Sequence, residues 1–274
     1  MVHKNGTIKI WAIFAIYFVL FVMVAGFNLR VADTATASMW LILSACIFVL
    51  SVFMLIKYKL PSKNQIIISL VFGLLMFAPF VSIAGLSAFL AVRIPIVTFL
   101  SAMAFFSISN HYPENTIVLI KNKSVKSIAI TIALGLAVGI TWGIINIFLN
   151  SDQPSPHFAL INFIVPLNPG IYEEMAFRAF IFAACLHFIG GKLTTKWQRF
   201  TVWFMMVIPH VLPHTPSMFI EQGIIAGIIS TVILTLVFGL PFALLQRKRD
   251  ITSAMIAHGV VMIIFFSMFG ISMS

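Results

Sequence analysis

Long apolar runs with almost no charge are the feature that most constrains how this chain can fold. A helix of about 20 apolar residues spans a bilayer, where helical hydrogen bonding satisfies the backbone. We therefore predict an all-α polytopic membrane helix bundle of about eight or nine transmembrane helices. The third and fourth runs form one stretch, which we divide at Ala84-Gly85. The runs lie at about residues 10–28, 39–56, 65–83, 87–109, 127–149, 170–189, 200–213, 223–245 and 251–273.

The shortage of charge excludes a soluble globular protein. Of 274 residues, 61% are hydrophobic and 9% are charged, whereas an ordinary soluble domain has about 25% charged residues. The two cysteines, Cys46 and Cys185, both lie inside apolar runs. They provide neither a disulfide framework nor a paired-cysteine zinc site.

The net charge of +10 reflects membrane topology rather than nucleic-acid binding. The basic residues are dispersed in the short gaps between runs, and Lys and Arg are retained preferentially on the cytoplasmic side. We expect a multi-pass protein of the cell membrane, surrounded by the lipid bilayer, with its N-terminus inside and no nucleic-acid partner. Under the nine-run division, the basic groups all fall on one side: the N-terminus and residues 57–63, 121–126, 192–199 and 247–249.

The segment between the fifth and sixth runs, residues 157–170, is too short to span the membrane. Pro166, Asn168, Pro169 and Gly170 interrupt it before the next helix. Irregular backbone at membrane depth is tolerated only against protein or a water-filled cavity. We therefore expect an interfacial or re-entrant segment, and a polar cavity near the start of the sixth helix.

Ionisable residues within a membrane are costly and usually functional. The densest group opens the sixth helix, where Glu174 and Arg178 stand one turn apart in the favourable order for an ion pair. The position one turn after Glu173 is Phe177. Glu173 thus suits the transfer of a proton from water and back; the alternative is that both acids only stabilise a helix N-terminus. The ionisable residues inside or at the edge of the runs are Arg93, Glu173, Glu174, Arg178, His187, His210, His214 and His258.

Histidines occur on the helices that follow this group. His210 and His214 are one turn apart, but Pro213 is expected to end the helix before His214, so His210 is better placed. His258 is the only ionisable residue of the last run, and His187, at the far end of the sixth helix, is assigned to the membrane interface. A glutamate and two histidines on three helices can converge on one water, as a glutamate-activated nucleophile or as a metal-bound hydroxide. Both arrangements hydrolyse an amide bond.

The pattern Glu173-Glu174-x-x-x-Arg178, followed by a histidine on the next helix and another on the last, resembles the CPBP intramembrane proteases. These are the CAAX proteases and bacteriocin-processing enzymes, also called Abi proteins. The resemblance covers about residues 157–270. It implies N-terminal transmembrane helices over residues 1–150 and a CPBP-like catalytic membrane core, or CAAX-protease-like core, over residues 151–274.

The resemblance also implies a role for each residue of the pattern. Glu173 and His210 are expected to activate the attacking water, and His258 to help stabilise the oxyanion. Glu174 and Arg178 are expected to support the site.

Two positions depart from the family pattern. Met206 stands where the family has Phe, four residues before His210, and Met262 stands where it has Asn, four residues after His258. Methionine cannot donate a hydrogen bond, and loss of one oxyanion donor costs about 10²–10³ in rate. The second departure therefore supports a catalytically weakened or inactive protein as an alternative.

These residues predict an intramembrane endopeptidase that hydrolyses a peptide bond in a membrane-associated peptide or protein with a Glu/His-activated water. Zinc, if used, would be held by Glu173, His210 and His258, so the glutamate protease and the metalloprotease both stay open. The competing prediction is a CPBP-like membrane scaffold with a regulatory or immunity role. A transporter with a proton-coupled Glu173 is disfavoured, because no inverted repeat is evident and the polar residues gather in the second half.

Overall fold

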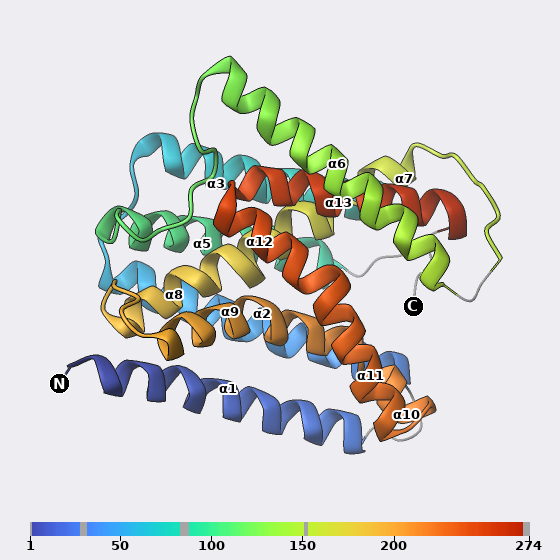
Figure 1. The fold of residues 1–274 in the computed structure, drawn as a ribbon, viewed down its shortest axis with the longest axis horizontal. Coiled ribbons are helices and arrows are strands. Elements are labelled where there is room, and N and C mark those ends of the chain that lie inside the picture. Colours follow the sequence, from blue (N-terminus) through green and yellow to red (C-terminus); the bar gives the residue numbers. More distant parts are fainter. Residues whose placement is uncertain (1, 28–31, 83–87, 151–152, 271–274) are drawn as a thin grey trace. The chain divides into compact units, whose positions relative to one another are not determined.

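The computed structural model describes residues 2–27, 32–82, 88–150 and 153–270. Helices supply the regular structure of these residues, and none of them lies in a β-strand (Figure 1). The all-α prediction is therefore confirmed. The predicted break at Ala84-Gly85 lies outside the described residues.

Within the described residues, six helical segments are long and apolar enough to cross a membrane. This finding supports the prediction of a multi-pass membrane protein. Three of the predicted runs instead form shorter helices. The run predicted at 65–83 meets a short apolar helical stretch at 63–79, the run at 170–189 begins as a π-helix, and the run at 200–213 falls largely in a helix of 16 residues. The six segments are Gly6–Gly26, Thr34–Lys57, Val92–His111, Val125–Leu149, Ile224–Lys248 and Ile251–Phe269.

The chain divides into two compact units. Both halves of the sequence contribute to each unit. Three helices begin in one unit and end in the other: α5 (Ala88–His111), η1 (Asn168–Ala179) and α12 (Leu240–Lys248). The division at residue 150, which separates the chain by expected function, stays a prediction. Unit 1 comprises Met1–Pro61, Met103–Thr116 and Phe177–Ala243, and unit 2 comprises Ser62–Ala102, Ile117–Ala176 and Leu244–Ser274.

In unit 1, aromatic side chains and hydrogen bonds join the first helix to α9. Trp11 stacks on Trp197 with ring centroids 5.5 Å apart, and its indole N–H donates to Thr201 Oγ1 at 3.0 Å. One turn and a half further on, the Tyr17 hydroxyl donates to the Pro209 carbonyl at 2.9 Å. The helices of unit 1 are α1 (Val2–Phe27), α2 (Ala32–Lys57), α8 (Phe180–Ile189), α9 (Lys196–Val211), η2 (Leu212–His214), α10 (Pro216–Glu221), α11 (Ile224–Leu234) and η3 (Thr235–Gly239).

In unit 2, α6 packs against α13 along a row of glycines. A Cβ added to Gly139 would lie 2.7 Å from Val260 Cβ and 2.8 Å from the Ala257 carbonyl oxygen. Gly135 and Gly143, one turn to either side, are equally close to α13. Small residues at this spacing let membrane helices approach closely. The helices of unit 2 are α3 (Lys63–Leu75), α4 (Phe77–Ser82), α6 (Val125–Leu149), α7 (Ile161–Ile164) and α13 (Ile251–Phe269).

A buried aspartate fixes the start of α13. Asp250 caps the helix by accepting from the Ser253 N–H at 2.9 Å. Its second oxygen accepts from Thr131 Oγ1 on α6 at 2.6 Å and from the Lys121 N–H at 3.2 Å. One carboxylate thus holds α13, α6 and the loop before α6 together. These contacts fix the start of the helix that carries His258.

The segment before the sixth run lies along the end of α13. The Ser155 N–H donates to the Met268 carbonyl at 2.7 Å, and the His157 N–H donates to the Ser267 carbonyl at 2.8 Å. A single helical turn, α7, follows before η1. The segment is not among the candidate spans of the described chain, which agrees with its predicted shortness. Whether it is interfacial or re-entrant stays a prediction.

Candidate active site

The two adjacent glutamates lie on a π-helix. The sequence predicts an ordinary α-helix here, and this prediction is wrong for Asn168–Ala179, which is π-helical before α8 continues as an α-helix. Pro169 has no N–H, and Gly170 is a weak helix former, so the start of the segment favours α-helix poorly. π-Helical turns are rare and often occur at functional sites.

Glu174 is completely buried and is bound through both carboxylate oxygens. His258 Nδ1 lies 2.7 Å from Oε1, and Gln246 Nε2 donates to Oε2 at 2.8 Å and to the Glu174 carbonyl at 2.9 Å. All three residues belong to unit 2. Glu174 therefore orients the His258 ring and is itself held by Gln246.

Glu173 lies on the other side of the same imidazole. Its Oε2 is 3.9 Å from His258 Nε2, and its side chain is 11% exposed. This separation is too long for a direct hydrogen bond, and one water beside the pair can contact both atoms. Because an ionised Glu174 accepts from Nδ1–H, the neutral ring presents the Nε2 lone pair toward Glu173, whereas the protonated ring presents an N–H donor.

In unit 1, His210 is packed among aromatic rings. It is 3% exposed and stacks on Phe177, with ring centroids 5.7 Å apart and an angle of 22° between the planes. Trp40 of α2 contacts both rings, at 5.8 Å from His210 and 5.6 Å from Phe177. Phe177 is the fourth residue after Glu173 on η1. The aromatic contacts therefore fix the His210 ring against Phe177 within unit 1.

His214 follows the end of α9, as its preceding proline predicts. The α-helix ends at Val211, and Leu212–His214 form a 3₁₀ turn. Even so, the His214 ring stays 5.4 Å from the His210 ring and 4.8 Å from Trp40. The predicted helix end is confirmed, and the turn keeps the two imidazoles together.

Arg178, near the end of η1, is buried in unit 1. Only 1% of it is exposed, and its guanidinium carbon lies 5.4 Å from the centroid of the Phe242 ring. Such a cation–π contact stabilises a desolvated arginine. Its predicted pair with Glu174 would join residues assigned to different units and stays a prediction.

The two remaining candidates from the sequence have other surroundings. His187 of unit 1 is near Lys57, with Nε2 and Nζ 3.4 Å apart, and Tyr58 contacts its Nδ1. This neighbourhood agrees with the assignment of His187 to the membrane interface. Arg93 is half-buried on α5 in unit 2.

An apolar cavity of about 600 Å³ lies within unit 2 beside these carboxylates. Gly170, at the start of η1, and Gly259, next to His258, are among the residues that line it, together with Met255 and Phe72. The sequence predicts a polar cavity near the start of the sixth helix. The cavity described here is apolar, because α3 and α13 face it with aliphatic side chains. The polar cavity stays a prediction.

Sequence reasoning missed two residues of this region, Trp40 and Gln246. Trp40 lies inside an apolar run, where an aromatic residue gives no signal of function. Gln246 stands beside the basic group at 247–249 and reads as part of a loop. A polar amide in the last turns of an apolar helix was the signal that could have identified it.

The comparisons with known proteins agree with the sequence pattern. Residues 155–264 match the family described as Type II CAAX prenyl endopeptidase Rce1-like. No curated protein and no solved structure matches the chain. The matched range includes every residue of the predicted pattern: Glu173, Glu174, Arg178, His210 and His258.

Proposed function

We propose, from the premise that residues 155–264 are an Rce1-like type II CAAX prenyl endopeptidase (CPBP/Abi) family domain, that this protein is an intramembrane endopeptidase. It hydrolyses a peptide bond in a membrane-associated peptide or protein. The observation that carries the proposal is the family match over residues 155–264, a range that includes all five residues of the predicted pattern.

In the proposed reaction, Glu173 and His210 activate one water. Glu173 takes a proton from it while the water oxygen bonds to the scissile carbonyl carbon. Protonated His258 donates from Nε2 to the oxyanion that forms. Glu173 then returns its proton to the leaving nitrogen as the C–N bond breaks. The 3.9 Å separation of Glu173 Oε2 and His258 Nε2 supports one water beside the pair that contacts both groups.

Glu174 and Arg178 have supporting roles in this proposal. The 2.7 Å contact of Glu174 with His258 Nδ1 keeps the reactive nitrogen of the ring directed away from Glu174. The apolar cavity of unit 2 supports an apolar substrate segment, because its lining includes Gly170, on the helix that carries both glutamates, and Gly259, the chain neighbour of His258.

Zinc is a second proposed mode of the same reaction, because carboxylate oxygens and imidazole nitrogens are among its usual ligands. Glu173, His210 and His258 would hold it, and Glu174 behind His258 resembles the carboxylates that orient zinc-binding histidines. Zinc would supply a bound hydroxide near neutral pH. The zinc content of the purified wild type and of His258→Ala, measured by elemental mass spectrometry, separates this mode from the glutamate mode.

We also propose nine transmembrane segments. Six of them are the long candidates, and the other three are the helical runs at 63–79, 168–189 and 196–211. These three are shorter, and the run at 168–189 is partly π-helical. Labelling of single cysteines placed in the gaps between them, from either side of the membrane, tests this count.

The test of the activity uses Glu173→Ala and His210→Ala in cells that otherwise lack the protein. Membrane proteins and secreted peptides are compared with those of cells carrying the wild type. Both variants are expected to accumulate an uncleaved substrate, whereas Glu221→Ala and His157→Ala, which change exposed residues, leave cleavage unchanged. Thermal melting in detergent shows whether each variant folds. Full cleavage by both site variants contradicts the mechanism.

Met262 supports a second function, a CPBP-like scaffold with a regulatory or immunity role. It follows His258 by one turn on α13 and cannot donate to an oxyanion. A scaffold keeps its cellular phenotype in Glu173→Ala and His210→Ala, whereas a protease loses it.

A further inference from the structure

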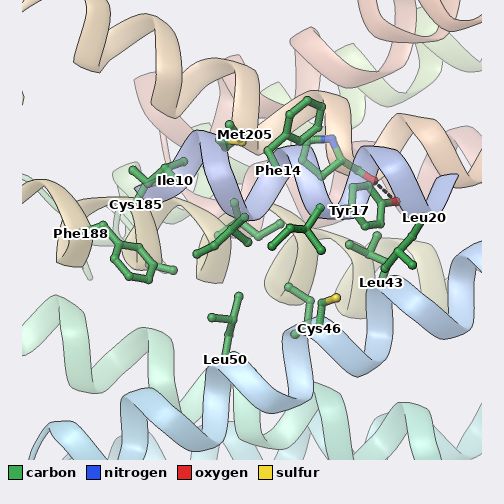
Figure 2. Close-up of a pocket in the computed structure, with 16 residues that line it drawn as sticks. Ile10, Phe14, Tyr17, Leu20, Leu43, Cys46, Leu50, Cys185, Phe188 and Met205 are labelled. Carbon is green, nitrogen blue, oxygen red and sulfur yellow. Dashed lines mark hydrogen bonds between the residues drawn. The ribbon is translucent and has the colours of Figure 1, made fainter. Parts of the chain in front are cut away.

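An apolar cavity of about 180 Å³ lies within unit 1, lined by α1, α2, α8 and α9. Figure 2 shows Ile10, Cys185 and Phe188 toward one end, and Tyr17, Leu20 and Leu43 toward the other. The Tyr17 hydroxyl is already engaged by the Pro209 carbonyl. An apolar cavity of this size stays dry and accepts an apolar guest.

The lining favours a hydrocarbon chain as that guest. On α1 the lining residues extend from Ile10 to Leu20, a rise of about 15 Å along the helix. This length of lining along α1 suits an elongated chain rather than a compact ring. A peptide backbone is excluded, because it would lose its hydrogen bonds to water without gaining new ones from this lining.

Basic side chains gather at the end with Ile10 and Phe188. Lys9 precedes Ile10, and His187 precedes Phe188. Lys57 Nζ lies 3.4 Å from His187 Nε2, and Lys9 and His111 also act electrostatically on this ring. Lys9 and Lys57 are exposed, and in the described part of the chain neither forms an ion pair with a carboxylate. A site for a negatively charged group therefore adjoins the apolar cavity.

We propose that unit 1 binds one anionic phospholipid, with an acyl chain in this cavity and the headgroup phosphate at Lys9 and Lys57. The ammonium groups donate to the phosphate oxygens and remain in the headgroup layer. A zwitterionic lipid offers the same chain but carries its own cation, which offsets the attraction of the two lysines. The site is independent of the proposed protease activity.

Native mass spectrometry of the full chain tests this site with phosphatidylglycerol and phosphatidylcholine of identical acyl chains. Because each lysine contributes about a fivefold preference for an anionic headgroup, the wild type is expected to bind one phosphatidylglycerol about 25-fold more tightly than phosphatidylcholine. The double variant Lys9→Gln/Lys57→Gln is expected to bind the two lipids equally. The control Lys123→Gln/Lys126→Gln, which changes exposed lysines of unit 2, keeps the preference.

Filling the cavity tests the place of the acyl chain. Ala184→Phe and, separately, Leu50→Trp place a ring among the lining residues and are expected to abolish retention of both lipids. Thermal melting in detergent identifies a variant that does not fold, and the other variant then decides. Equal binding of the two lipids by the wild type overturns the proposal. So does a preference that survives Lys9→Gln/Lys57→Gln, a preference lost in the control, or lipid retained by a folded cavity variant.

Discussion

Glu174 Oε1 lies 2.7 Å from His258 Nδ1, and both side chains are buried within unit 2. The contact joins η1 to α13 across 84 positions of the sequence. It fixes the ring whose other nitrogen faces Glu173. Glu174 is therefore a positioning residue, which acts on the reaction through His258.

Glu174→Gln is expected to lower kcat by about 10–100-fold with little change in KM, as for other groups that orient an active-site histidine. The amide keeps the shape of the side chain but accepts through one atom only. Cleavage kinetics measure the effect, and nuclear magnetic resonance of the His258 ring reports the accompanying change of tautomer. The matched control is Glu114→Gln, an exposed acid. An unchanged tautomer with an unchanged kcat contradicts the role.

Met262→Asn is expected to increase the rate of cleavage. It places an amide donor one turn after His258 on α13, and one oxyanion donor contributes about 10²–10³ in rate when it is well aligned. Single-turnover kinetics of the purified variant measure the gain. Met268→Asn, further along the same helix, is the control. A rate at or below that of the wild type shows that the wild type already has its donor from another residue.

Gly139→Ala is expected to destabilise the protein by about 1–3 kcal/mol, because the new methyl group overpacks the α6–α13 contact. Its Cβ would lie 2.7 Å from Val260 Cβ. Thermal melting in detergent measures the loss. Gly26→Ala on α1, where nothing lies within 4 Å of an added Cβ, is expected to keep or raise the stability. In a double-mutant cycle, Val260→Gly, which removes that Cβ, should lower the cost of Gly139→Ala. An unchanged cost of Gly139→Ala would contradict the packing argument.

Asp250→Ala is expected to cost about 2–4 kcal/mol, since it removes a helix cap and leaves buried donors without an acceptor. Those donors include Thr131 Oγ1 and the Ser253 N–H. Ser62→Ala removes the exposed cap of α3 and should cost only about 1 kcal/mol. Denaturation followed by circular dichroism compares the two. Equal losses would mean that burial adds nothing to the Asp250 cap.

The helices were predictable because apolar length and the gaps between runs are local properties of the sequence. The six long spans and the helix end before His214 follow from such local rules. The number of spanning helices and their α or π geometry were harder to predict from the sequence. The helical stretch at 63–79 is apolar but short, and the run at 170–189 contains Glu173, Glu174 and Arg178. Hydropathy reports neither a turn inside a run nor a change from α to π geometry.

The partners within the site show the same limit. Spacing along a helix is the only geometry that a sequence displays directly, so the sequence predicts the pair of Glu174 with Arg178, four residues away, but no partner on another helix. Its contacts with His258 and Gln246 depend on how α13 and the end of α12 pack against η1 within unit 2. The apolar cavity beside Gly170 was not predicted, because a sequence does not show which side chains of α3 face it.

The π-helical winding of Asn168–Ala179 makes this region sensitive to chain length as well as to residue identity. A π turn holds one residue more than an α turn, since its hydrogen bonds run from i to i+5 rather than to i+4. Deleting one residue before Glu173 would let the segment relax to α-helix and would rotate both carboxylates relative to His258. Two chains with the same glutamates and histidines can therefore differ in activity through a single insertion or deletion in this segment, a difference that no comparison of catalytic residues alone would detect.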